Sequence, residues 1–476
     1  MLKIWINKCK NEYNNEENQE YIVFNLFNKK NHSNIKTDIE NLWRRFGVKT
    51  IPNINEDLII IALSVYAIDK RIPRRVFNDG WTRYIEVNIP VLDLEKWNKV
   101  KYDLEKTLGF LSGDVWKFNF RSTLEKFRGN KVSKFNLVKN KEFDCVSLFS
   151  GGLDSFCGAV KLLEEKKNIC FVGFKEYGLL EKRQKQIFDI LENNYNQSNK
   201  EILLFNGTPY APMVNNEKDN KYNMGVESTS RSRSFLFIAG ALAIAAIIGN
   251  DIPVYIPENG FIGLNVALTM SRKGTCSTRT THPYFLRELN KIIEAIGVTN
   301  KVENFYAYRS KGNIVEEVKS TQAFIEGAGL TISCSHPCLS RYDKITPPLN
   351  CGYCYPCLIR RASMNNAKSC DGNYNTNYNT NYNISREFIN KYNKIEGRAS
   401  DLKAVLWSLN RYLSLEDKSE VKKLVIKTGN LCNDEVEKLS EVYIESMEQL
   451  KIMVIEESKN DNGDILNYTG VEIKNE

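Results

Sequence analysis

The segment SGGLDS, residues 150–155, has the residue types needed to bind a phosphate group. Its two glycines allow the backbone to approach an anion closely, and a helix that begins directly after a loop offers N–H donors and a favourable dipole. Ser150 and Ser155 add hydroxyl donors, and the carboxylate of Asp154 could help to hold Mg²⁺. We therefore expect a phosphate site, whose contacts are Ser150, Gly151, Gly152, Leu153, Asp154 and Ser155.

This segment is not a Walker A loop, which requires the pattern G-x-x-x-x-G-K-[ST]. The lysine and the glycine spacing are both missing, so γ-phosphate cleavage is not indicated. The simpler alternative is a serine- and glycine-rich turn without catalytic function. An apolar strand-like run before the loop and an amphipathic run after it favour the phosphate site.

A second group of residues has the spacing of a metal site. Cys351, Cys354 and Cys357 form C-x-x-C-x-x-C, and Cys334 lies seventeen residues earlier. Four thiolates satisfy tetrahedral zinc, and such a closed site is structural rather than catalytic. The sequence alone leaves Cys338 and His336 as competitors of Cys334 for the fourth position.

Two other interpretations of the cysteines are possible. The C-x-x-C-x-x-C spacing also begins the ferredoxin run of an iron–sulfur protein, but no cysteine follows at the required fourth spacing. Reduced core cysteines without a metal fit poorly, because Gly352 and Pro356 indicate a turn at this point. Zinc is the favoured interpretation.

The elements that must position these residues follow an alternating pattern. From residue 144, strand-like runs (144–150, 168–174, 201–205, 253–257 and 303–308) alternate with helical runs (156–167, 179–194, 284–296 and 313–326). Such alternation is typical of βαβ units with a parallel sheet. We expect a doubly wound α/β domain over 141–370, with its zinc segment at 334–357.

The flanking regions carry no chemical signature. Residues 1–140 combine strand-like runs at 21–27 and 83–91 with a helix at 56–70, which predicts an α+β accessory domain. The repeat NYNTNYNTNYN at 373–383 reads as a flexible insertion, and helical spacing predicts a helical region over 384–476.

The composition fits an ordinary globular chain. Of the 476 residues, 42% are hydrophobic and 26% charged, which excludes disordered and collagen-like classes. The net charge of +8 does not by itself indicate nucleic-acid binding. The apolar run 235–249 is too short to cross a bilayer, so a buried core helix is expected. With no visible export signal, we expect a cytoplasmic protein with reduced cysteines.

The two motifs together resemble the QueC family of 7-cyano-7-deazaguanine synthases. The shared features are SGGLDS, the pattern T-x-S-C ending at Cys334, C-G-x-C-x-x-C-x-x-R ending at Arg360, and Arg231 four residues before a Phe-Leu pair. The resemblance covers residues 144–363. QueC belongs to the PP-loop ATP pyrophosphatases, which have an adenine nucleotide alpha hydrolase-like fold and split ATP between the α and β phosphates.

The resemblance implies an ATP-dependent ligase that uses Mg²⁺, contains Zn²⁺ and adenylates the carboxylate of 7-carboxy-7-deazaguanine to form an amide. It implies that Asp154, Ser155 and Arg231 act in catalysis and that Arg231 and the SGGLDS loop bind ATP. The zinc ligands would be Cys334, Cys351, Cys354 and Cys357. The chemistry needs no protein nucleophile, because adenylation depends on positioning and charge stabilisation.

Two stretches depart from QueC and resemble QueC-like proteins of antiphage defence systems (QatC and the type IV CBASS homologue). They are PENGFIGLN at 257–265 and STRTTHPYF at 277–285. That branch implies a partner protein from the same defence operon, whose N-terminus would be joined to the deazaguanine. Nucleic acid is not expected as the primary substrate, nor is a membrane.

Residues in these stretches are candidates for the substrate pocket. Glu258, Asn259 and Gly260 would lie at the carboxyl end of a parallel strand, where doubly wound folds bind ligands, although a plain turn is an equal alternative. Arg279 and Thr280 offer donors for an anion. His282 could accept a proton from the attacking amine or could simply stabilise a loop.

Three alternative functions remain open at this stage. The first is free 7-cyano-7-deazaguanine synthesis for queuosine. The second is RNA thiolation, which would need a reactive thiol such as Cys276 or Cys157. The third is a non-catalytic module that binds a nucleotide or deazaguanine.

Overall fold

A five-stranded parallel sheet forms the centre of the molecule in the computed structural model. The structure describes residues 1–9, 20–26, 33–127, 137–138, 142–214, 221–222, 225–227, 231–269, 279–344, 346–368, 400–459, 463 and 465–466. The 373–383 repeat, Cys276 and the first two residues of the 277–285 stretch lie outside these ranges.

The central sheet has the strand order β11-β10-β6-β7-β8, and all its pairs are parallel. Its strands are β6 (Cys145–Leu148), β7 (Ile169–Phe174), β8 (Lys200–Phe205), β10 (Val254–Tyr255) and β11 (Val302–Glu303). From β6 the chain adds β7 and then β8 on one side, and afterwards it adds β10 and β11 on the other side of β6. This is a doubly wound sheet with its switch point between β6 and β10, where such folds bind ligands. The predicted α/β class is confirmed.

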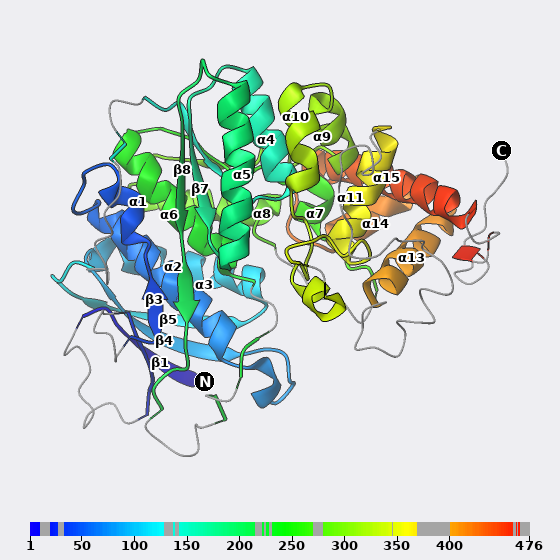
Figure 1. The fold of residues 1–476 in the computed structure, drawn as a ribbon. Coiled ribbons are helices and arrows are strands. Elements are labelled where there is room, and N and C mark those ends of the chain that lie inside the picture. Colours follow the sequence, from blue (N-terminus) through cyan, green and yellow to red (C-terminus); the bar gives the residue numbers. More distant parts are fainter. Residues whose placement is uncertain are drawn as a thin grey trace.

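Helices cover both faces of this sheet (Figure 1). They are α4 (Leu153–Glu164), α5 (Gly178–Asn194), α6 (Arg233–Ile248), α8 (Pro283–Ala295), α9 (Lys311–Val318) and α10 (Gln322–Gly327). The short helix α7 (Gly260–Leu264) packs instead in the core of the C-terminal helices. The single helix predicted at 313–326 is wrong, since it is divided between α9 and α10. The break is at Thr321, whose hydroxyl donates to Val318 O and accepts from the N–H of Phe324.

The N-terminal region also contains a parallel sheet, with strand order β2-β1-β4-β5. Its elements are β1 (Leu2–Asn7), β2 (Ile22–Asn25), β3 (Ile35–Thr37), α1 (Glu40–Arg44), α2 (Asn53–Arg71), β4 (Tyr84–Val91), α3 (Leu94–Ser112) and β5 (Val115–Ser122). The expected α+β arrangement is therefore corrected to α/β. The reason is that α3 crosses over between the parallel strands β4 and β5, a connection that needs a helix.

One hydrophobic core joins the N-terminal region to the central sheet. It contains residues of β1, β4, α2, α6 and β7. Helix α2 packs along α6, and β3 pairs antiparallel with β9 (Gly207–Pro209) of the central region. Most of α6 is buried, as predicted for the apolar run. None of the described helices combines the length and apolar character of a membrane crossing.

The C-terminal helices form a separate core with the cysteine segment. They are α11 (Tyr355–Asn366), α13 (Ser400–Leu413), α14 (Val421–Ile426) and α15 (Asn433–Ser458). The last three lie within 384–476, where helices were predicted, whereas α11 precedes that range. Figure 1 shows this group on the side of the central sheet opposite the N-terminal strands. Because α11 carries Cys357, this core fixes one end of the cysteine cluster.

Candidate functional site

A cavity of about 810 Å³ lies at the switch point of the central sheet. The loop after β6, the loop after β10, the first turn of α6 and the segment 332–342 all contribute to its wall. The N-terminal region contributes Tyr66 and Lys70 from α2. The N-terminal region, the central sheet region and the cysteine segment thus all contribute to one cavity.

The SGGLDS loop forms one wall of this cavity. Gly151 has a φ of +82°, which favours glycine, and Gly152 precedes the first turn of α4. The Ser150 and Ser155 hydroxyl oxygens are 3.0 Å apart, and the N–H of Gly152 donates to Ser150 Oγ at 3.2 Å. Buried Gln184 of α5 supports the loop by donating to the carbonyls of Phe149 and Ser150. Except for Gly151, the predicted phosphate contacts all line the cavity.

Asp154 is the buried acid of this loop and is fully engaged by neighbouring side chains. Lys311 Nζ lies 2.8 Å from Asp154 Oδ1, and Asn259 Nδ2 donates to Asp154 Oδ2 at 2.7 Å and to Glu258 Oε1 at 3.1 Å. Burial would raise the pKa of Asp154, but the Lys311 charge and hydrogen bonds from its neighbours hold that pKa below the usual value. Burial and the charge of Asp154 raise the pKa of Glu258 well above its usual value. Of the two acids, Glu258 therefore holds a proton more readily than Asp154 does.

The cavity wall carries more positive than negative groups. Ion pairs join Lys311 to Asp154 and Arg233 to Glu176. The other charged wall residues that the structure describes are Lys70, Arg231, Arg341 and Glu258. Among these described wall residues, five basic side chains outnumber three acidic ones, so the cavity is suited to an anionic ligand.

The four predicted zinc ligands come together beside the same cavity. The sulfurs of Cys334, Cys351, Cys354 and Cys357 all lie within 4.8 Å of one another, and the Cys351–Cys357 and Cys354–Cys334 pairs are 4.0 and 3.9 Å apart. A Zn–S bond of about 2.3 Å places tetrahedral sulfurs about 3.8 Å apart, so the cluster fits a single zinc ion. Neither Cys338 nor His336 belongs to the group, so Cys334 is the fourth member.

Backbone N–H groups point at three of these sulfurs, as expected for thiolates. Cys354 Sγ accepts from Ser335, Cys334 Sγ from His336 and Cys351, and Cys351 Sγ from Cys354. Hydrogen bonds from the other cysteines, that of Cys334 foremost, lower the pKa of Cys354 well below its usual value. In metal sites, hydrogen-bond donors around the ligand atoms stabilise the charge of the ligands.

A short segment connects the cysteine cluster to the SGGLDS loop. The N–H of Ile332 donates to Gly151 O at 2.9 Å, and the N–H of Leu153 approaches Ser333 Oγ at 3.5 Å. Buried Asn350, next to the ligand Cys351, accepts from the N–H of Ser333 at 3.0 Å. The loop and the cluster are therefore two ends of one hydrogen-bonded unit.

Arg360, the last residue of the cysteine motif, supports the same segment from α11. It is fully buried, and its guanidinium donates to the carbonyl and hydroxyl of Thr331 and to Ala328 O. The spacing from Cys357 to Arg360 thus places a buried cation behind the segment that contacts the phosphate loop.

Several predicted site residues have structural roles instead. His282 is fully buried and caps α8, with Nδ1 accepting from the N–H of Tyr284 and Nε2 3.1 Å from Thr428 Oγ1. Burial lowers the pKa of His282 to about 3, and it does not line the cavity, so it is not positioned as a base. Arg279 lies over the Phe110 ring and donates to Phe110 O. Thr280 does line the cavity.

Gly260 and Asn259 also have structural roles. A Cβ on Gly260 would lie 2.2 Å from Ala307 O, so this position requires glycine for a close backbone approach. Asn259 caps α7, since its Oδ1 accepts from the N–H of Ile262. Of the predicted substrate residues, Glu258 and Thr280 line the cavity, and Asn259 contacts it only through Asp154 and Glu258.

Sequence reasoning missed the residues that reach the site from distant segments. Lys311, Lys70, Ser333 and Arg233 all line the cavity. Ser333 could have been found inside the TISC pattern, because it lies directly before a ligand. Lys311 and Lys70 have no local signal, because only the tertiary fold brings them to Asp154 and α6.

Cys157, the candidate thiol for RNA thiolation that the structure describes, lies in the core. It is fully buried on α4, and burial raises the pKa of its thiol. A thiol that reacts must be accessible and easily ionised, so Cys157 does not fit that role.

Comparison of the chain with protein-family models finds none that matches, and comparison with curated proteins finds no significant relative.

Proposed function

We propose that this protein is a QueC-like, PP-loop ATP-dependent ligase that adenylates the carboxylate of 7-carboxy-7-deazaguanine and converts it to an amide. One observation carries the proposal: the SGGLDS loop and the four-cysteine cluster line or adjoin a single cationic cavity at the switch point of a doubly wound sheet. A polyphosphate is the ligand whose charge best matches this cavity.

In the proposed reaction, a carboxylate oxygen of the substrate attacks the α-phosphorus of ATP, and pyrophosphate leaves. The SGGLDS loop, with N–H donors at the start of α4, would bind the departing phosphates. Lys311 and Arg231 would stabilise the negative charge that develops there. An amine then attacks the acyl carbon, AMP leaves, and the amine loses a proton to form the amide.

The N-terminus of a partner protein from the same defence operon is the amine acceptor that we favour. An acyl adenylate reacts with the amine that is held closest, so a docking surface changes the product without changing the activating site. Ammonia is the alternative acceptor. It would give the free amide, and a second ATP would have to activate the amide oxygen, which leaves with AMP, to give free 7-cyano-7-deazaguanine. We place the reaction in the cytoplasm.

Zinc fits the cysteine cluster, where Cys334, Cys351, Cys354 and Cys357 would hold it. Bound there, it would supply a rigid cross-link rather than chemistry, because four thiolates leave no open coordination position. Magnesium, unlike zinc, would not be held mainly by protein side chains. Both oxygens of Asp154 already have protein partners, so Mg²⁺ would be held chiefly by the phosphates of ATP.

The decisive test is incubation of the protein with 7-carboxy-7-deazaguanine, Mg²⁺ and ATP. We expect AMP and pyrophosphate as products, and an Asp154→Asn variant should lose at least a hundredfold in pyrophosphate exchange, because Lys311 loses its countercharge beside the loop. Asp189→Asn, an exposed carboxylate of α5, is the control and should match the wild type.

Release of ADP and phosphate without AMP would contradict the mechanism. Wild-type exchange in Asp154→Asn would contradict the role of the loop. Intact-mass analysis of a co-expressed operon partner then separates the two acceptors, since only a polypeptide acceptor gains the mass of the deazaguanine.

A further inference from the structure

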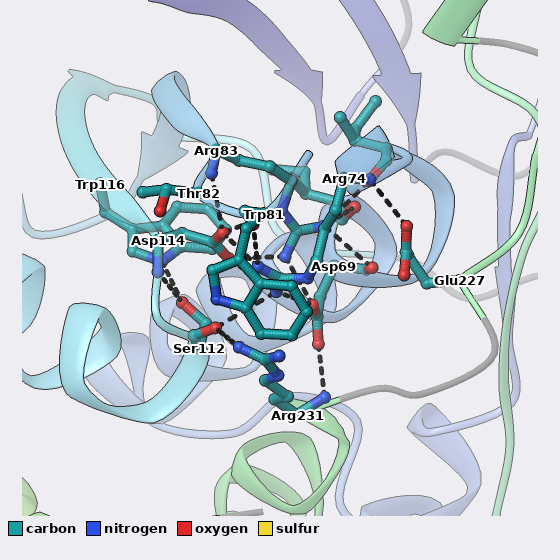
Figure 2. Close-up of polar contacts among 12 residues, drawn as sticks. Asp69, Arg74, Trp81, Thr82, Arg83, Ser112, Asp114, Trp116, Glu227 and Arg231 are labelled. Carbon is teal, nitrogen blue, oxygen red and sulfur yellow. Dashed lines mark hydrogen bonds and ion pairs between the residues drawn. The ribbon is translucent and has the colours of Figure 1, made fainter. Parts of the chain in front are cut away.

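A buried cluster of two arginines and two aspartates lies in the N-terminal region, next to the start of α6 (Figure 2). Arg83 is fully buried and pairs with Asp69 and Asp114, with 2.6 Å contacts to both. Arg74 pairs with the same carboxylates at 3.3 and 2.6 Å. Burial alone would destabilise these charges, but each is matched by a countercharge within the cluster.

Asp69 differs from Asp114 because it also binds a distant part of the chain. Its Oδ1 accepts from Arg83 and Arg74, whereas its Oδ2 accepts from the N–H of Arg231 at 2.7 Å, the N–H of Ser232 at 3.0 Å and Ser232 Oγ at 2.9 Å. Figure 2 shows the carboxylate between Arg83 and the backbone of Arg231. One side chain thus joins the cluster to the start of α6.

The Ser232 hydroxyl does not cap its own helix. Ser232 is the N-cap residue of α6, a position at which serine normally accepts from a backbone N–H of the first turn. Here it makes no such bond and donates to Asp69 instead. The start of α6 is therefore held by α2 rather than by its own cap.

Further contacts hold the same segment. The N–H of Arg74 donates to Glu227 Oε1 at 2.7 Å, and the N–H of Glu227 donates to Lys70 O at 2.9 Å. The Arg231 guanidinium donates to Ser112 O and lies over the Trp81 ring, 4.6 Å from its centroid. Because Arg231, Arg233 and Ser234 line the cavity, the cluster fixes part of the cavity wall.

We propose that Asp69 is a positioning residue through which the N-terminal region sets the α6 wall of the cavity and thereby the affinity for ATP. This inference rests on the proposed function for its ligand and adds the role of the N-terminal region. Asp69 does not line the cavity itself, so it would act through Arg231, Ser232 and the first turn of α6.

The test uses the full-length protein with Asp69→Asn, Ser232→Ala and a matched control, Asp57→Asn. Asp57 is a buried carboxylate of the same helix that accepts from the N–H groups of Leu92 and Asp93 and from Trp97 Nε1, and these partners all lie outside α6. Hydrogen exchange at residues 231–237 and binding of α,β-methylene ATP with Mg²⁺ are measured, together with the KM for ATP and kcat in pyrophosphate exchange.

We expect Asp69→Asn to accelerate exchange at 231–237, to weaken analogue binding about tenfold and to lower kcat/KM for ATP by at least that factor, with kcat falling as well because Arg231 lies on the displaced segment. Ser232→Ala should change the same quantities about threefold, and it decides the question if Asp69→Asn fails to fold. Asp57→Asn should lower the unfolding midpoint without these effects.

Unchanged exchange and affinity in folded Asp69→Asn and Ser232→Ala would overturn the inference. Equal effects in Asp57→Asn would also overturn it, because they would indicate general destabilisation. If the wild type binds no ATP analogue, the proposed function fails, and exchange at 231–237 alone still decides whether Asp69 positions the wall.

Discussion

At the scale of single residues, burial decides the role of His282. Its ring packs 5.2 Å from that of Phe110, centroid to centroid, and both ring nitrogens have partners. Because burial lowers its pKa to about 3, the folded protein keeps this histidine neutral at every pH near neutrality. In the unfolded chain, histidine has a pKa of about 6.5.

This difference predicts a pH-dependent stability. Between pH 6.5 and 3 the unfolded state binds the additional proton, so stability falls as the pH falls. From pH 7.5 to 5.5, the free energy of unfolding of the wild type should drop about 1.4 kcal/mol more than that of His282→Asn, which keeps an N-cap acceptor. Urea unfolding at both pH values measures it, and parallel losses in the two proteins would contradict the assigned burial.

At the scale of elements, the segment 331–334 links the cysteine cluster to the phosphate loop. Cys334 is a member of the cluster, while the neighbouring Ile332 and Ser333 contact Gly151 and Leu153. A metal that holds Cys334 to α11 also holds these contacts. The cluster is thus placed to stabilise the loop as well as the C-terminal core.

Removal of the metal should therefore disturb the phosphate loop. We expect chelation, or Cys351→Ser, to accelerate hydrogen exchange at 150–155 and to weaken binding of the ATP analogue about tenfold. Cys432→Ser is the control, because Cys432 is exposed and outside the cluster. Metal content is measured alongside, and a metal-free protein with an unchanged loop would rule out this coupling.

At the scale of the whole molecule, the N-terminal and central regions do not have separate cores. Residues of α2 and α6 belong to one cluster, which also includes strands of both parallel sheets. The cavity also depends on the N-terminal region, since Tyr66 and Lys70 of α2 line it. The N-terminal region is therefore part of the site's framework.

Deletion of residues 1–140 should prevent folding of the remainder. The fragment 141–476 would expose the apolar side of α6, and we expect it to aggregate or to lack a cooperative thermal transition. Co-expression of residues 1–140 as a separate chain should restore solubility if the shared core is the cause. A monomeric fragment with a sharp transition by circular dichroism would contradict this expectation.

The sequence alone was sufficient for features formed by residues close together in the chain. The glycine-containing loop between a strand and a helix, the cysteine spacing and the strand–helix alternation depend on local patterns. The structure contains the SGGLDS loop between β6 and α4, the cysteine cluster and the parallel sheet. The fourth member was not fixed by residue type, since Cys338 and His336 competed with Cys334 until the structure placed Cys334 in the cluster. Glycine, cysteine and periodic apolar residues have local physical requirements, so their patterns can be read directly.

Only the tertiary structure decided which distant side chains meet. Asp69 and Arg231 are 162 residues apart, and Lys311 reaches Asp154 from another element. The same fold made His282 a cap and Gly260 a packing position. Charged residues such as Lys311 and Asp69 look like surface residues in a sequence. Burial and pairing give them their roles, and both depend on how the sheets and helices pack.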